Sequence, residues 1–176
     1  MPGCKEIATF GGSSSVDYYQ IGEDKYVNNQ LFQVETINPA PIPISYPERT
    51  PPPILQAISK AASLVWMSSD SAANQARQAV ECLLDDAGFP PTNAARKQIS
   101  LHERILSFQA SDPENGNVLL ATKWLGNSGS HVGGLSRADV LDAFDMIEFV
   151  LENRYGTTKA DLMAKVAAIN AAKGPA

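Results

Sequence analysis

The chain is poor in the residues that form disulfide frameworks or membrane anchors. Only two of its 176 residues are cysteine, Cys4 and Cys82, which are too few for a disulfide framework. No apolar run approaches the roughly 18 residues of a membrane-spanning helix, and the N-terminus lacks the charged and apolar segments of a secretory signal. We therefore expect a cytoplasmic protein that does not use a membrane as a partner.

Positive charge is also scarce. The chain has 14 Lys and Arg against 19 Asp and Glu, a net charge of −5 and a pI of about 5.0. This balance excludes a protein whose main task is to neutralise nucleic-acid phosphates, although it permits a local basic patch. The cysteines and the two histidines are far apart and form no zinc motif, and no phosphate-binding or dinucleotide-binding loop is present. We predict no metal and no cofactor.

The composition changes near residue 50. Residues 1–53 form an N-terminal arm, and residues 54–176 are rich in Ala, Leu and charged residues with helical periodicity. Seven of the 12 prolines lie between residues 39 and 53, and because proline fixes φ and lacks an N–H donor, this segment must be extended. We predict a strap that lies on the helical body, with Ile42 and Ile44 inserted into the core.

The part of the arm before the strap contains β-branched and aromatic residues. Residues 25–37 predict one or two short strands, with a hairpin turn at Asn28 and Asn29. The Gly-Gly-Ser-Ser-Ser run at residues 11–15 predicts a flexible segment.

The remainder predicts an all-α, up-and-down bundle of five or six helices. Apolar spacing, capping residues and glycine or proline stops place these helices at residues 53–67, 69–87, 100–109, 113–125, 136–155 and 158–173. The last helix has a thinner apolar stripe than the others, made by Leu162, Val166 and Ile169. It docks either on the bundle or on a second copy of the chain.

The segment from Lys123 to Gly134 is the most informative for chemistry. Four of its 12 residues are glycine, and glycines crowded together indicate close backbone approach to a neighbouring helix or to a bound group. His131 follows Asn127 by four residues, so the two share a face if the helix continues that far. The histidine can act as a general acid or base, or the pair can simply fix a turn at the helix end.

A second candidate is the pair Arg77 and Glu81, spaced i, i+4. It is either a helix-surface ion pair or a polar pair at the core edge that contacts the Asn127 and His131 turn. His102, beside Glu103 and Arg104, is interpreted as a surface or capping histidine.

The order and spacing of several stretches resemble a bacterial family, the domain of unknown function DUF4145. The resemblance covers roughly residues 37–156, and its stretches are 38–41, 76–86, 101–105, 124–131 and 139–148. The family is grouped with the HEPN superfamily (higher eukaryotes and prokaryotes nucleotide-binding). The resemblance implies a helical bundle that forms a homodimer. Related chains often carry a zinc ribbon before the strap; in this chain either that module has been lost or the arm is its remnant.

Many HEPN domains are metal-independent ribonucleases, and their motif is an arginine followed after four to six residues by a histidine. The histidine moves a proton at the ribose hydroxyl and the arginine stabilises the charge on the phosphate. In this chain His131 fits the histidine and Asn127 fits the polar residue after the arginine, but the arginine position holds Gly126.

The resemblance therefore implies a non-catalytic interaction module of a bacterial defence, toxin–antitoxin or mobile-element system. Arg77, Glu81, Lys123 and Gly126 are its candidate ligand-binding residues, beside His131 and Asn127. Two alternatives stay open. One is a divergent ribonuclease that uses His131 and takes its cation from Lys123 or Arg77. The other is a domain that binds a nucleotide or a small anion at the same glycine-rich turn.

Overall fold

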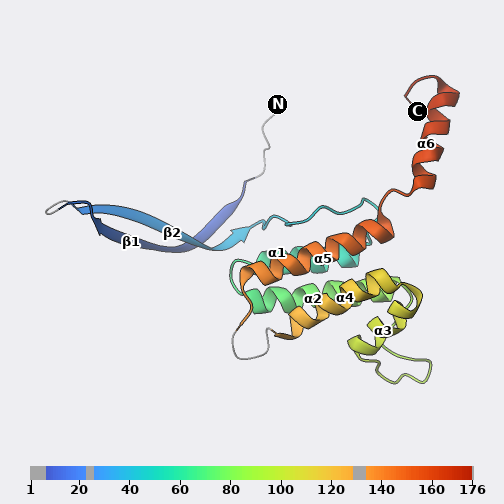
Figure 1. The fold of residues 1–176 in the computed structure, drawn as a ribbon, viewed down its shortest axis with the longest axis horizontal. Helices are drawn as coiled ribbons and strands as arrows, with labels where there is room; N and C mark the ends of the chain where they lie inside the picture. Colours follow the sequence, from blue (N-terminus) through green and yellow to red (C-terminus); the bar gives the residue numbers. More distant parts are fainter. Residues whose placement is uncertain (1–6, 23–25, 129–133, 176) are drawn as a thin grey trace.

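The computed structural model describes residues 7–22, 26–128 and 134–175. Within these ranges a two-stranded hairpin is followed by six helices, in the order that Figure 1 shows. The elements are β1 (Thr9–Gln20), β2 (Tyr26–Asn38), α1 (Pro52–Leu64), α2 (Ser69–Asp86), α3 (Leu101–Ser111), α4 (Pro113–Ser128), α5 (Arg137–Tyr155) and α6 (Lys159–Ala172). The chain is mostly helical, as the sequence predicts.

The hairpin is longer than predicted, and its turn lies elsewhere. Residues 11–15 belong to β1 and are not a flexible segment, while Asn28 and Asn29 pair with Tyr18 and Asp17 inside β2. The prediction of short strands with a turn at the two asparagines was therefore wrong. The glycines of the run serve a register shift between Gly11 and Gly12, where a Cβ on Gly12 would collide with the Gln33 carbonyl.

The proline-rich strap connects β2 to α1 along the helical body (Figure 1). Ile44 is buried in the hydrophobic core and Ile42 packs against that core, which confirms both predicted anchors. The backbone N–H of Ser45 donates to the carboxylate of Glu148 in α5 at 3.0 Å. The strap is thus held by apolar contacts and by a polar contact to the last helix of the bundle.

Helices α1 to α5 pack around one core. Predicted core positions on three helices are fully buried, among them Ile58 on α1, Leu84 on α2 and Phe144 on α5. Helix starts follow local chemistry: Ser100 and Ser136 each accept from a backbone N–H, while an acidic side chain three residues later accepts from the serine. Each of these capping boxes lowers the pKa of its acidic residue, Glu103 or Asp139, because the hydrogen bonds are made to the charged carboxylate.

A buried arginine joins α3 to the C-terminal end of α2. Arg104 donates to the carbonyl oxygens of Phe89 and Glu81 at 2.7 and 3.1 Å, and to the carboxylate of Asp85 at 2.6 Å. Its side chain is only 4% exposed. Phe89 lies just beyond the end of α2, so the guanidinium supplies a donor to a carbonyl that the helix leaves open, while Glu81 lies inside α2 and accepts Arg104 as an additional donor.

The last helix, α6, leaves the bundle after Gly156 and projects away from it (Figure 1). No residue of α6 is buried, and α6 packs against no other helix or strand of the described chain. Of the two predicted docking modes, docking on the chain's own bundle is absent from this structure. No described helix is both long enough and apolar enough to cross a bilayer.

Candidate functional site

The candidate site is built where the last turns of α4 cross α2. The fourth helix continues to Ser128, three residues past its predicted end, so Gly126 and Asn127 are helical. A Cβ on Gly126 would lie 3.3 Å from the carbonyl oxygen of Ala73 and 3.5 Å from the Cβ of Arg77. Of the two explanations for glycine here, the neighbouring helix accounts for Gly126.

Arg77 and Glu81 form the expected pair along α2. Their closest charged atoms, Nε and Oε1, are 3.6 Å apart, and the side chains are 35% and 29% exposed. Gln78 adds a hydrogen bond of 3.2 Å to the other oxygen of Glu81. The pair is thus half-buried, at the edge of the core, and Arg77 lies beside Gly126. The pair lies at the core edge, as the second interpretation has it, while its contact with the turn of Asn127 and His131 stays a prediction because His131 lies outside the described residues.

Lys123 is the other cation at this end of α4. Its side chain is almost fully buried, and Nζ lies 3.6 Å from the ring centroid of Trp124. The same ring lies 5.8 Å from the imidazole of His102 on α3. The contact with the indole ring stabilises the Lys123 ammonium group in this position. Moving Lys123 away to bind an anion would therefore cost free energy.

Of the two residues predicted to be catalytic, Asn127 is part of the described structure and His131 is not. Asn127 is half-buried in the last turn of α4. His131 lies outside the described residues, so its predicted alignment with Asn127 stays a prediction. The chain re-enters the described part at Gly134, and the next backbone N–H, of Leu135, donates to the carboxylate of Asp70 at 3.0 Å. A carboxylate therefore stands beside the segment that follows His131.

The electrostatics of the described part do not favour a phosphate here. Arg77 is paired with Glu81, Lys123 lies over Trp124, and Asp70 adds a carboxylate beside Leu135. Within the described ranges, no group of three His, Cys, Asp or Glu side chains is close enough to hold a metal ion. The geometry is that of helix packing reinforced by polar contacts.

Sequence reasoning missed a second polar cluster, at the C-terminal end of α5. The Tyr155 hydroxyl donates to Asp86 at 2.6 Å, and burial together with that bond raises the pKa of Tyr155 to about 12. Beyond it, Arg49 of the strap makes two hydrogen bonds of 3.0 Å to the carboxylate of Asp161 on α6. No spacing signal links residues 49 and 161, since a contact 112 residues apart depends on the whole fold.

Comparisons with known proteins identify one family. The family model "Domain of unknown function (DUF4145)" matches residues 59–172, which is more than half of the chain and includes α2 to α6 entirely. No curated protein and no solved structure matches the chain significantly. The match confirms the family predicted from the order and spacing of the five stretches: this chain belongs to the DUF4145 family.

Proposed function

We propose that this chain is a non-catalytic, HEPN-like interaction module that forms a homodimer. It serves a bacterial defence, toxin–antitoxin or mobile-element system, where its task is to hold proteins together and not to cleave RNA. The observation that carries the proposal is the amount of apolar surface on α6 and on the hairpin that no described part of the chain covers.

The hairpin shows this surface clearly. Paired residues of an antiparallel ladder share a face, and the register places Phe10, Val16, Tyr18 and Phe32 on one face of the ribbon. All four are exposed, with Tyr18 at 70%. The rings of Phe10 and Phe32 contact each other edge-on at 6.3 Å and are covered by no other aromatic ring of the described chain. An isolated two-stranded ribbon is marginally stable in water, so a partner on this face would stabilise it.

The arrangement at the end of α4 supports a module without catalysis. The motif position for arginine is Gly126, and its backbone lies against Ala73 of α2. Both replacement cations, Arg77 and Lys123, have partners of their own. A ribonuclease needs a cation aimed at the phosphate, and removing such a group costs roughly 3–4 kcal/mol of transition-state stabilisation.

Light scattering at several protein concentrations tests the proposal. We expect a mass of twice the 18.9 kDa chain at micromolar concentration, falling toward the single-chain mass on dilution. A single-chain mass over the whole range would contradict the homodimer. A matched pair of variants on the ribbon, Phe32→Ser and Gln33→Ser, separates the two faces of β2. If the apolar face carries part of the interface, only the first substitution weakens the dimer.

A further inference from the structure

The last helix exposes an ordered stripe of side chains. Lys159, Leu162, Val166 and Ile169 follow an i, i+3, i+7, i+10 spacing, which places them on one face of α6, and Lys173 continues that face at the C-cap. The three apolar members are 38–54% exposed, and none has a partner in the described chain. The stripe is therefore apolar in the middle and positive at both ends.

A matching stripe runs along the outer face of α5. Asp142, Asp145, Phe149 and Glu152 have the same i, i+3, i+7, i+10 spacing, and all four are exposed. This stripe contains no basic residue and has an exposed aromatic ring near its centre. Two helices with apolar positions at three- and four-residue spacing can interdigitate, and opposite charges beside the seam favour one pairing over others.

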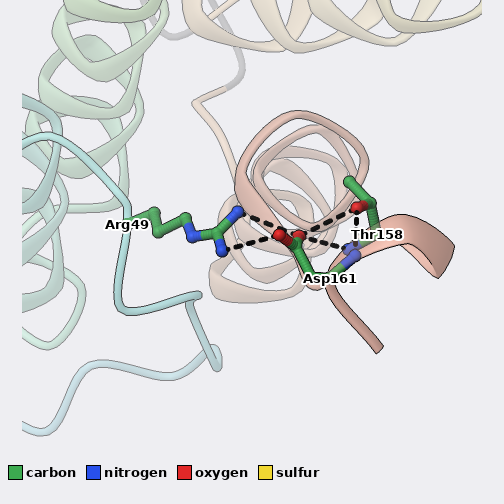
Figure 2. Close-up of polar contacts among 3 residues, drawn as sticks. All are labelled: Arg49, Thr158 and Asp161. Atoms are coloured by element: carbon green, nitrogen blue, oxygen red, sulfur yellow. Dashed lines mark hydrogen bonds and ion pairs between the residues drawn. The ribbon is translucent and has the colours of Figure 1, made fainter. Parts of the chain in front are cut away.

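In the described part of the chain α6 makes no contact with its own α5, and its first turn is held against the strap instead. Asp161 caps the first turn of α6 by accepting from the backbone N–H and the hydroxyl of Thr158, at 3.0 and 2.8 Å. The same carboxylate accepts both hydrogen bonds from Arg49, so that strap, cap and helix are joined at one side chain (Figure 2). This arrangement ties the start of α6 to the strap and not to α5.

The hydrogen bonds between Arg49 and Asp161 also change the pKa of the Asp161 carboxyl group. The guanidinium, and then the cap at Thr158, hold the pKa of Asp161 well below its usual range. Asp161 is the only acidic residue of α6, and Arg49 already neutralises it. What α6 presents outward is positive charge and apolar surface, and the exposed face of α5 presents negative charge and a phenyl ring.

We infer that α6 of one chain docks on the outer face of α5 of a second copy, and the second copy returns the same contact. The inference rests on the proposed homodimer and names the surface that forms it. A reciprocal exchange of this kind has two-fold symmetry, so both complementary stripes are used twice and neither stays exposed. The family match extends to residue 172, so α6 lies within the part of the chain that the family model covers.

A matched pair of substitutions on α6 tests the surface. Val166→Asp places a charge at the centre of the stripe, and we expect the dissociation constant of the dimer to rise at least about tenfold. Ala164→Asp makes a similar change on the opposite face of the same helix and should leave the dissociation constant unchanged. Equal effects of both substitutions, or no effect of either, would overturn the inference.

Disulfide trapping between two different chains shows which helices meet. A tagged chain carrying Phe149→Cys is mixed with an untagged chain carrying Val166→Cys, allowed to exchange subunits and oxidised. We expect a covalent dimer of one tagged and one untagged chain. Neither variant alone should form a covalent dimer, and neither should the wild-type chain with its two native cysteines. The double variant in one chain distinguishes an internal contact: if it crosslinks only within itself, α6 folds back on its own α5 and the inference is wrong.

The outcomes separate the two proposals. A wild-type chain that stays monomeric overturns both the homodimer and the docking of α6. A wild-type dimer that gives no mixed crosslink and tolerates Val166→Asp overturns the docking of α6 alone and leaves the homodimer standing.

Discussion

Gly126 of α4 and Ala73 of α2 lie so close that a single added carbon would sit 3.3 Å from the Ala73 carbonyl oxygen. That oxygen belongs to helix backbone, which cannot move aside as a flexible side chain can. Gly126 therefore has a packing role. An arginine there would require α2 and α4 to separate.

Replacing Gly126 with arginine tests this packing role. We expect Gly126→Arg to destabilise the fold by roughly 1–3 kcal/mol, because the larger side chain overpacks the crossing of α2 and α4. Urea denaturation gives the free energy of unfolding. Asn74→Arg, at an exposed position of α2, adds the same charge without the clash and should change stability by less than about 0.5 kcal/mol. Equal stability of both variants would show that the crossing is loose.

The buried arginine gives a second prediction. Arg104→Ala leaves the Phe89 carbonyl without its donor, removes a second donor from the Glu81 carbonyl and opens a cavity, so we expect a loss of roughly 3 kcal/mol of unfolding free energy. Asp85→Asn removes only the charge of its ion-pair partner, whose side chain is 52% exposed, and should cost less than about 1 kcal/mol. If the two variants lose the same amount in denaturation, the ion pair and not the carbonyl bonds holds α3 on α2.

Because of Tyr155, the free energy of unfolding depends on pH in the alkaline range. Its pKa in the folded chain, about 12, is above the ordinary value of 10.0 because burial and the bond to Asp86 favour the neutral phenol. The stabilisation is therefore complete below pH 10 and is lost as pH rises from about 10 to about 12. After allowance for solvent at this half-exposed ring, it amounts to about 1 kcal/mol. Denaturation of the wild type and of Tyr155→Phe should converge across that pH range. A difference that stays constant would contradict the raised pKa.

The hairpin contributes little to the core, since no residue of β1 or β2 belongs to the buried cluster. Deletion of residues 1–36 should therefore change the free energy of unfolding of the helical part by less than about 1 kcal/mol, as measured by denaturation. Removal of Ile44 by Ile44→Ala should cost more, about 2–4 kcal/mol, because that side chain is in the core. A larger effect of the deletion would show that the ribbon supports the bundle.

The sequence predicts most of the helical part because local chemistry decides it. Ser100 and Ser136 begin helices through their own hydroxyl groups, and the apolar spacing on α5 identifies Phe144 and Ile147 as core residues. The arm was harder to predict, since Ser13, Ser14 and Ser15 have little intrinsic preference for strands. They form a strand because they pair with Gln33, Phe32 and Leu31 of the partner strand.

In the candidate site, too, contacts within one helix could be predicted from the sequence and contacts between elements could not. Spacing along one helix is enough to predict the pair of Arg77 and Glu81, and it does predict that pair. Contacts between helices, such as that of Gly126 with Ala73, depend on how α2 and α4 cross, and periodicity contains no information on that crossing. The bond between Arg49 and Asp161 depends in addition on the path of the strap.

We propose that the end of α4 has a packing role and takes no part in RNA cleavage. The most direct test of this proposal measures cleavage of single-stranded and structured RNA by the wild type, by His131→Ala and by Lys123→Ala, without added metal. We predict no cleavage above the buffer control for any of the three proteins. Cleavage by the wild type that His131→Ala abolishes would contradict the account and establish the ribonuclease alternative.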